Sequence, residues 1–364
     1  MRAALFPVLG IALASAWLFA QSAETTIGVR YVPDQERLKL PTDRTEIGSM
    51  HGDVAVSAVG EVYISVEGSV RQRFAILGPN PGLQVYAPDG RFLHNVVGAP
   101  SDLHGFIIHR EAGTEYIYGA RLAAGPSLAD QTRAGVDGEI VVKMTLDGTV
   151  AMTIPASRIP EQFKNKGADG QSYTRLTGIA VAPNGDLYVA DGYASDYIHR
   201  FDRNGRYLAS FGGKQAPYGF RTLHKLTIDT RFQPARLLAC DRENGRVVHL
   251  SLDGALLGIV ASDLRRPAAV AVRGEYAAIG ELQGRVTLLD KGGQVAGTLG
   301  ENTVADEIAS NRTEPSKWRS GIVTAPHGVA FNARGDLFVS EFNLAGRVHH
   351  FAAQAGSASL NIIR

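Results

Sequence analysis

Cysteine is almost absent from this chain, and neither sign of charge dominates it. A single cysteine among 364 residues excludes an internal disulfide and any zinc site built from cysteines. Lysine and arginine total 37 while aspartate and glutamate total 36, which leaves a net charge of +1. A chain with so little excess charge lacks the electrostatic signature of proteins that bind nucleic acid or anionic membranes. We therefore expect neither as a partner.

Long apolar runs are also missing, except at the start of the chain. Residues 1–23 read MRAALFPVLGIALASAWLFAQSA, in which Arg2 precedes an apolar run and small residues follow at Ala20 and Ala23. This arrangement is typical of a secretory signal peptide. A membrane-anchoring helix is the alternative, although the run is short for a span of about 20 residues. We expect a bacterial periplasmic or secreted protein, in which residues 24–364 form a single domain.

What the sequence has in abundance is glycine, with 41 residues placed largely in short turns. Residues 177–211 and 326–351 follow the same order: an apolar strand, a turn containing glycine, a second apolar strand, an acidic residue, a polar loop and a third strand. Alternating apolar and polar residues between Asn-Gly or Asp-Gly turns indicate β-hairpins. Such units are typical of propeller blades, which usually take about 40–50 residues each, so the longer spacings in this chain indicate insertions.

Six copies of this unit can be aligned by the residue that begins the innermost strand. The six positions are His51, His104, Thr177, His224, Ala268 and His327. A closed ring must also pair its last blade, because an open sheet edge invites aggregation. Little strand-forming sequence follows Phe351, whereas the run Thr26–Leu38 can supply a missing outer strand. The sequence therefore predicts an all-β, six-bladed β-propeller whose ring is closed by an N-terminal strand.

Acidic residues follow the second strand in four copies, and an arginine follows later in three of them. The acids are Asp191, Asp241, Glu281 and Glu341, and the arginines are Arg246, Arg285 and Arg347. Carboxylates in such positions commonly accept hydrogen bonds from backbone N–H groups of a loop. We expect these carboxylates to stabilise loops and the arginines to pair with them between blades.

Four of the six aligned positions are histidines, although the chain contains only ten. Blades 2, 4 and 6 alternate around the ring, so we expect His104, His224 and His327 to surround one metal ion with threefold geometry. Three protein ligands with an open position are typical of catalytic zinc sites, and imidazole also suits iron, copper or nickel. A hydrogen-bonded structural role is the alternative for any one histidine. His51 breaks the threefold pattern and is either a fourth ligand or a substrate contact.

The blade pattern, in which an apolar strand precedes a Gly-Asp or Gly-Glu turn and a strand ending in an acid, resembles the NHL-repeat propellers. Within that group, residues 190–212, 223–250 and 325–342 are similar to the peptidyl-α-hydroxyglycine α-amidating lyases. The segments DGY and DRENGR carry most of this similarity, which extends roughly over residues 30–352.

The resemblance implies a specific chemistry. It places a zinc ion on His104, His224 and His327 and makes Tyr193, in the segment DGY, the base. Zinc would act as a Lewis acid on the substrate hydroxyl, and Tyr193 would take the proton, which requires its pKa to fall from about 10. The implied reaction is a carbon–nitrogen lyase reaction that splits a small peptide-like substrate, a peptidyl-α-hydroxyglycine, into a peptide amide and glyoxylate.

The chain also departs from the amidating lyases. Glu67 lies near the place of the family's arginine after the second strand of the first blade, and Arg71 or Arg73 could substitute for it in binding substrate. Gly328 replaces the aspartate that follows the last histidine, which argues against the family's structural calcium, and Ala194 replaces a cysteine.

Two other functions are compatible with the repeat. NHL propellers often bind a peptide or protein on one face without catalysis, and a fold does not determine a function. A calcium-dependent lactone hydrolase of the gluconolactonase type is the other alternative. It would need an axial cluster of acidic and amide side chains, whereas the axial positions here are mostly histidine.

Overall fold

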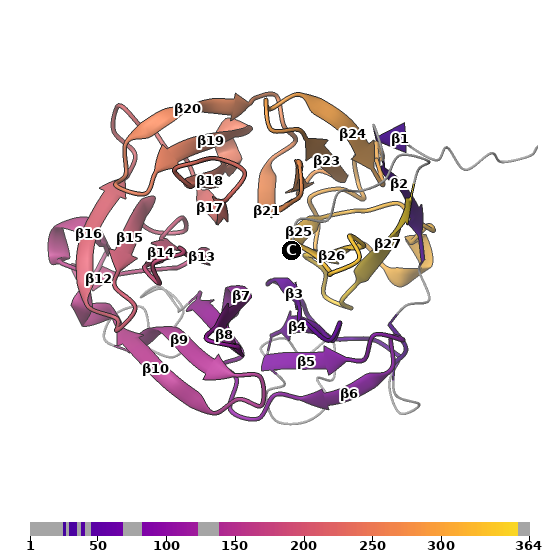
Figure 1. Ribbon diagram of the computed structural model, residues 1–364, viewed down its shortest axis with the longest axis horizontal. Helices are drawn as coiled ribbons and strands as arrows, with labels where there is room; N and C mark the ends of the chain where they lie inside the picture. Colours follow the sequence, from indigo (N-terminus) through magenta and orange to yellow (C-terminus); the bar gives the residue numbers. More distant parts are fainter. Residues whose placement is uncertain are drawn as a thin grey trace, which may run out of the picture.

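Antiparallel sheets stand around one central axis and form six blades (Figure 1). The computed structural model describes residues 25–26, 29–34, 38–40, 45–67, 82–122 and 138–355. The prediction of an all-β, six-bladed propeller is confirmed. Residues 1–23, predicted as a signal peptide, lie outside the described residues. Within the described part of the chain, no helix has the length and apolar character needed to cross a bilayer.

Five blades each consist of four consecutive strands, the first innermost and the fourth outermost. Blade 1 comprises β3 (Val54–Val56), β4 (Val62–Val66), β5 (Gly82–Tyr86) and β6 (Phe92–Asn95). Blade 2 comprises β7 (Leu103–Glu111), β8 (Thr114–Arg121), β9 (Glu139–Thr145) and β10 (Val150–Pro155). Blade 3 comprises β13 (Gly178–Val181), β14 (Leu187–Ala190), β15 (Tyr197–Phe201) and β16 (Tyr207–Gly212). Blade 4 comprises β17 (Leu223–Asp229), β18 (Arg236–Asp241), β19 (Arg246–Ser251) and β20 (Leu256–Ala261). Blade 5 comprises β21 (Pro267–Arg273), β22 (Tyr276–Glu281), β23 (Arg285–Leu289) and β24 (Val295–Leu299).

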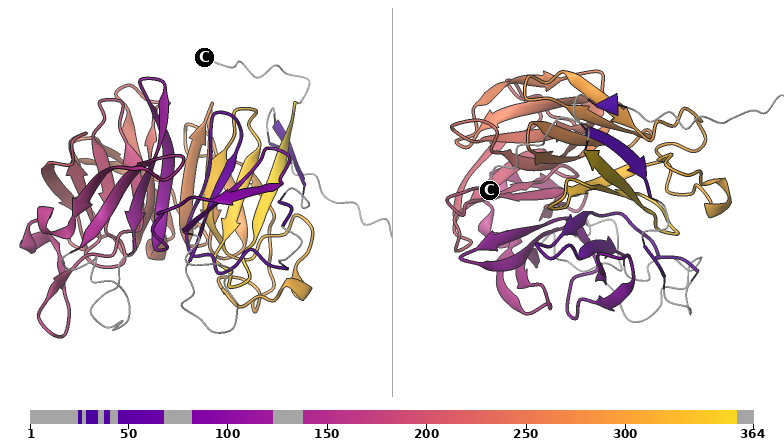
Figure 2. Two further views of the ribbon diagram at one scale, coloured as in Figure 1. Left: turned by 90° about the horizontal axis from the view of Figure 1, so that it is seen from below. Right: turned by 45° about the vertical axis from the view of Figure 1, so that its right-hand side comes forward.

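The sixth blade combines strands from the two ends of the described chain. Its inner strands are β25 (Pro326–Phe331), β26 (Leu337–Glu341) and β27 (Val348–Ala355). The outer strand β2 (Val29–Pro33) pairs antiparallel with β27, and β1 (Thr25–Thr26) pairs with β2. Figure 2 shows β2 beside β27 on the outside of the ring. The predicted closure by an N-terminal strand is confirmed, and it leaves β27 with a partner on each side.

A few short elements lie outside the blades. They are the hairpin of β11 (Asn165–Lys166) and β12 (Ser172–Tyr173) and the 3₁₀ turns η2 (Ala156–Arg158), η3 (Glu161–Phe163), η4 (Arg242–Asn244) and η5 (Pro315–Lys317).

Apolar side chains fill the spaces between neighbouring blades. Tyr63 and Val85 of blade 1, for example, pack in one cluster with Phe106 and Ile117 of blade 2, and all four are almost completely buried. Side chains alternate between the two faces of a strand, so each sheet can contact both of its neighbours. Burial of one such side chain contributes about 1.5–3 kcal/mol. This packing fixes the positions of the inner strands that surround the axis.

Buried carboxylates at the ends of second strands hold the loops at one end of the channel. Oδ1 of Asp191 accepts the backbone N–H of Arg175 at 2.6 Å, and Oδ1 of Asp241 accepts that of Arg221 at 2.9 Å. Glu281 accepts the backbone N–H of Arg265 in the same way. The expectation that these carboxylates stabilise loops agrees with the structure.

The arginines that follow these acids pair within their own blades. Arg246 contacts Asp241 at 2.7 Å, and Arg285 contacts Glu281 at 2.8 Å. Each pair occupies opposed positions on the second and third strands of one sheet. The predicted pairing between blades is wrong, because cross-strand neighbours are closer than residues of the next sheet.

Candidate metal centre

Three histidines from alternate blades meet on the channel axis. His104 lies on β7, His224 on β17 and His327 on β25, and all three are buried. Their ring centroids form a nearly equilateral triangle with sides of 4.7, 4.8 and 4.8 Å. The structure thus brings together the three residues that the alternation of blades selected.

A main-chain carbonyl from the next blade orients each of these rings through Nδ1. The three pairs are His104 with Thr177 (2.8 Å), His224 with Ala268 (2.5 Å) and His327 with Gly52 (2.9 Å). A carbonyl oxygen can only accept a hydrogen bond, so Nδ1 must carry the ring proton. Each Nε2 therefore keeps its lone pair. Histidines that bind metals are usually held in this manner.

The free lone pairs fit a transition-metal ion. Nε2 of His104 and Nε2 of His327 are buried and have no hydrogen-bond partner among the described residues, while Nε2 of His224 accepts the hydroxyl of Tyr193 at 3.1 Å. Burial lowers the pKa of all three imidazoles well below 6.5, and neighbouring positive groups lower it further. Neutral imidazole is the form that binds metal, so this donor set suits zinc and similar ions.

His51 reaches the same cluster from a different position in its blade. The carbonyl that accepts from His327 belongs to Gly52, one residue after His51. The expectation that His51 stands in register with the other five inner-strand starts is therefore wrong. Its ring still lies 4.8 Å from that of His104 and 4.9 Å from that of His327.

His51 gives an alternative set of ligands, because ring nitrogens of His51, His104 and His327 all lie within 4.8 Å of one another. The set of His104, His224 and His327 is supported by the distances between its ring centroids. We favour His224 over His51 as the third ligand. His224 is buried and its Nδ1 is fixed by a carbonyl, whereas His51 is partly exposed and its Nδ1 lies 3.6 Å from a carboxylate oxygen of Glu67. This leaves His51 as a side chain that faces the neighbouring cavity.

A cavity of about 350 Å³ opens beside the histidines, and three arginines line it together with Tyr193 and Phe342. Arg175 precedes the inner strand of blade 3, Arg242 begins η4, and Arg266 precedes the inner strand of blade 5. Buried carboxylates accept the backbone N–H groups of Arg175 and of Arg265, the residue before Arg266, while the backbone N–H of Arg242 donates to the carbonyl of Thr222 at 3.2 Å. The cavity therefore presents positive charge at fixed positions.

Tyr193 lies between the histidines and these arginines. Its hydroxyl oxygen accepts a hydrogen bond from Nη1 of Arg242 at 2.9 Å, and the guanidinium groups of Arg175 and Arg242 lie 5.6 and 5.2 Å from its ring centre. Burial raises the pKa of Tyr193, and Arg242 opposes part of that rise. The protein groups alone therefore do not supply the lowered pKa that the role of base requires.

Two arginines have donors available for a ligand. Nε of Arg175 and Nε of Arg266 are buried and have no hydrogen-bond partner in the described part of the chain. Glu243 accepts from Nε of Arg242 at 2.9 Å and from Nη2 of Arg266 at 2.6 Å, so one carboxylate serves two cations. The excess positive charge and the free donors suit an anionic group.

These arginines were not identified from the sequence, although a signal was present. Arg175 and Arg266 each stand two residues before the axial position in the two blades whose axial residue, Thr177 or Ala268, is not histidine. The two arginines that the sequence did suggest, Arg71 and Arg73, lie outside the described residues.

No family model matches this chain. It is 34% identical to peptidyl-alpha-hydroxyglycine alpha-amidating lyase 1 of Drosophila melanogaster over 102 residues, which cover 26% of this chain and 18% of the fly protein. It is also 34% identical over 87 residues to peptidyl-glycine alpha-amidating monooxygenase B of Xenopus laevis, covering 22% of this chain and 10% of the frog protein. The matched region thus spans less than a fifth of either relative.

Solved structures with the same architecture are more distant in sequence. Virginiamycin B lyase from Staphylococcus aureus superimposes with a TM-score of 0.53 at 10% identity, over 88% of this chain and 99% of its own. A gluconolactonase from Xanthomonas campestris gives a TM-score of 0.53 at 12% identity, over 91% and 100% of the two chains. These likenesses show the fold alone. The chain is thus a six-bladed β-propeller that resembles the peptidyl-α-hydroxyglycine α-amidating lyases over about a quarter of its length.

Proposed function

We propose that this protein is an exported, zinc-dependent carbon–nitrogen lyase. Its substrate would be a small carbinolamide of the peptidyl-α-hydroxyglycine type, which the reaction splits into an amide and glyoxylate. The observation that carries this proposal is the position of Tyr193, whose hydroxyl lies 3.1 Å from Nε2 of His224 and 2.9 Å from Nη1 of Arg242. The candidate base, a candidate metal ligand and a guanidinium group thus lie within hydrogen-bonding distance of one oxygen atom.

His104, His224 and His327 would hold the ion through Nε2. A zinc ion bound there supplies a Lewis acid close to the cavity, which favours ionisation of a substrate hydroxyl. The carbonyl-bonded Nδ1 atoms keep the three rings from turning. The carboxylate of Asp53, which lies against Gly328, is already paired with Lys225, which argues against calcium beside that glycine.

Tyr193 would accept the proton of the substrate hydroxyl. Its phenolate is disfavoured by burial, and the hydrogen bond from Arg242 offsets only part of that effect, although the bond is strengthened when the oxygen becomes negative. The charge of a bound metal ion would have to supply the rest of the pKa decrease. The leaving amide nitrogen gains one proton, which balances the proton taken from the hydroxyl. The C–N bond breaks as the hydroxyl carbon becomes the aldehyde of glyoxylate, so no further reactant is needed.

Arg175 and Arg266 would bind the substrate carboxylate. Their Nε atoms are buried donors that lack a partner among the described residues, and guanidinium groups recognise carboxylates with charge-assisted hydrogen bonds. Phe342 and Leu282 line the same cavity and offer apolar contacts to the rest of the substrate. Binding at both ends would orient the hydroxyl carbon towards Tyr193.

The test is release of glyoxylate from α-hydroxyhippurate by protein purified without a histidine tag, combined with metal analysis of the same sample. We expect about one transition-metal ion per chain and glyoxylate in equal amount to benzamide. A protein that contains the metal but releases no glyoxylate would remove the lyase assignment. A protein with neither would favour a non-catalytic propeller that binds a peptide on its face.

A further inference from the structure

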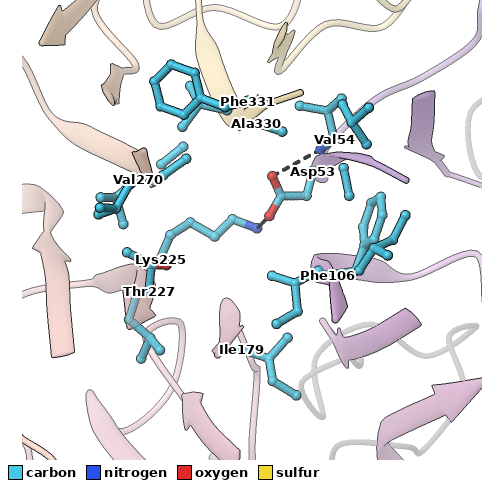
Figure 3. Close-up of a pocket in the computed structure, with 18 of the residues that line it drawn as sticks. Asp53, Val54, Phe106, Ile179, Lys225, Thr227, Val270, Ala330 and Phe331 are labelled. Atoms are coloured by element: carbon cyan, nitrogen blue, oxygen red, sulfur yellow. Dashed lines mark hydrogen bonds and ion pairs between the residues drawn. The ribbon is translucent and has the colours of Figure 1, made fainter. Parts of the chain in front are cut away.

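A second cavity, of about 270 Å³, lies further along the channel and contains one buried ion pair (Figure 3). Its walls are mostly apolar residues of the inner strands, such as Val54, Phe106 and Val270. Lys225 extends across it from blade 4 and meets the carboxylate of Asp53 from blade 1. Nζ and Oδ2 are 3.1 Å apart, and the two side chains are only 5% and 13% exposed.

A buried ion pair of this kind needs an explanation beyond stability. The desolvation of two charges consumes most of their mutual attraction, and apolar residues of similar volume often stabilise a protein equally well. Stability alone therefore does not account for this pair.

The ion pair is linked to the backbone segments that hold all three candidate ligands. Lys225 directly follows His224 in the chain, and its Nζ also donates a hydrogen bond to the main-chain carbonyl of His104. Asp53 directly follows Gly52, whose carbonyl orients His327. The chain of Asp53 is itself fixed, since its backbone N–H donates to Oγ of Ser65 at 2.8 Å.

The residues that follow the other two histidines leave space for this pair. Gly105 follows His104, and a Cβ atom there would lie 3.0 Å from Nζ of Lys225 and 2.7 Å from the carbonyl oxygen of Thr177. Gly328 follows His327, and a Cβ atom there would collide with the carboxylate of Asp53. Residues 105, 225 and 328 each follow a candidate ligand and border the same space. The side chain of Lys225 fills that space, and the other two positions are glycine.

We propose that the Lys225–Asp53 pair is a positioning device that sets the three histidines at the spacing a metal ion requires. The ammonium ties the backbone at His104 to the strand that carries His224, and Asp53 ties both to the backbone that orients His327. The proposal rests on the proposed metal centre, and it is independent of the lyase reaction.

The test compares metal affinity in the wild type with that in Lys225→Met/Asp53→Leu, which removes both charges together so that neither is left buried alone. Zinc affinity is measured by competition with a chromophoric chelator, and the ligand geometry by the visible spectrum of the cobalt(II) form. We expect the double variant to fold and to bind zinc about 10–100-fold more weakly, as is typical when support for metal ligands is lost. We also expect its cobalt spectrum to change.

The control is Arg231→Met, which breaks a buried ion pair with Asp229 at the far end of the same strand, β17. It should lower the melting temperature and leave zinc affinity unchanged.

In the metal-free proteins, ¹⁵N shifts of the histidine rings should show the Nδ1–H tautomer for His104 in the wild type and a mixture in the double variant.

Equal zinc affinity and an identical cobalt spectrum in the wild type and the double variant would overturn the positioning role, whether or not glyoxylate is released. Should the double variant fail to fold, Lys225→Met/Asp53→Asn provides the same comparison, because it also removes both charges and the amide keeps the volume of the carboxylate. A wild type that binds zinc and lacks lyase activity would instead reject the proposed reaction and leave this inference standing.

Discussion

The hydroxyl oxygen of Tyr193 lies 3.1 Å from Nε2 of His224, the nitrogen that a metal ion would use. Because Nδ1 of His224 donates to a carbonyl, its Nε2 can only accept, so the phenol donates its proton to this lone pair. Phenol and metal ion therefore compete for one nitrogen.

Replacement of this phenol should separate metal binding from catalysis. We expect Tyr193→Phe to bind zinc at least as tightly as the wild type, because Nε2 of His224 becomes free. Glyoxylate release should fall by about 100-fold or more if Tyr193 is the base. Chelator competition and steady-state kinetics on the same samples measure the two effects, and unchanged turnover would exclude Tyr193 as the base.

Loss of a candidate ligand should remove the metal and its stabilising effect. A ligand that binds only the folded state at 100 times its Kd stabilises the protein by about 2.7 kcal/mol. We expect addition of a chelator to lower the melting temperature of the wild type but not that of His104→Ala or His327→Ala. His94→Ala, at an exposed site on β6, is the matched control and should respond as the wild type does.

Removal of the Arg175 guanidinium, whose Nε has no hydrogen-bond partner among the described residues, should weaken recognition of the substrate carboxylate. Hydrogen bonds to charged groups contribute about 1.5–3 kcal/mol, so we expect Arg175→Met to lower kcat/KM for α-hydroxyhippurate by about 10–100-fold. The carboxamide analogue of this substrate should lose much less. Arg158→Met, at an exposed position, serves as control; an equal loss for both substrates would refute carboxylate binding by Arg175.

Asp196 should destabilise the fold at neutral pH. Burial raises the pKa of Asp196 from 3.8 to about 6, although its Oδ1 accepts the backbone N–H of Leu223 at 2.7 Å. A carboxyl whose pKa is higher in the folded state contributes its full stability below pH 3.8 and loses it as the pH rises through 6.

Asp196→Asn should reveal this effect. The asparagine keeps an acceptor for Leu223 and tolerates the positive φ of 61° at this position. We expect a higher melting temperature than the wild type at about pH 8 and little difference at about pH 4. A gain of the same size at both values would point to a cause other than the buried charge.

Glu341 should show the opposite dependence on pH. Burial tends to raise its pKa, but His349, Arg347 and Thr324 outweigh that effect and lower the pKa from 4.5 to about 2. Its contribution is therefore present above pH 4.5 and is lost as the pH falls towards 2. Glu341→Gln should reduce the free energy of unfolding in urea near pH 7 by up to about 3 kcal/mol. The deficit should shrink near pH 3, and a constant deficit would contradict the assignment.

The repeat explains how much the sequence could predict. A position that recurs in each blade can be counted, so the ring and the convergence of His104, His224 and His327 followed from the spacing of the repeats. The closure by β2 followed from the lack of strand-forming sequence after Phe351. Contacts that depend on side-chain length and on loop paths could not be counted in this way. Lys225 and Asp53 are far apart in the chain, and neither side chain is part of the repeated pattern. The one-residue offset of His51 depends on how strand β3 begins.

The closing strand has a consequence for assembly of the centre. Nδ1 of His327, in blade 6, donates to Gly52, which precedes β3 in blade 1, so the histidine cluster spans the seam between the last blade and the first. Joining such distant parts of a chain carries a large entropic cost and is slow. A metal ion at the proposed centre would therefore bind only after the ring has closed. Once bound, it would oppose separation of the first blade from the last.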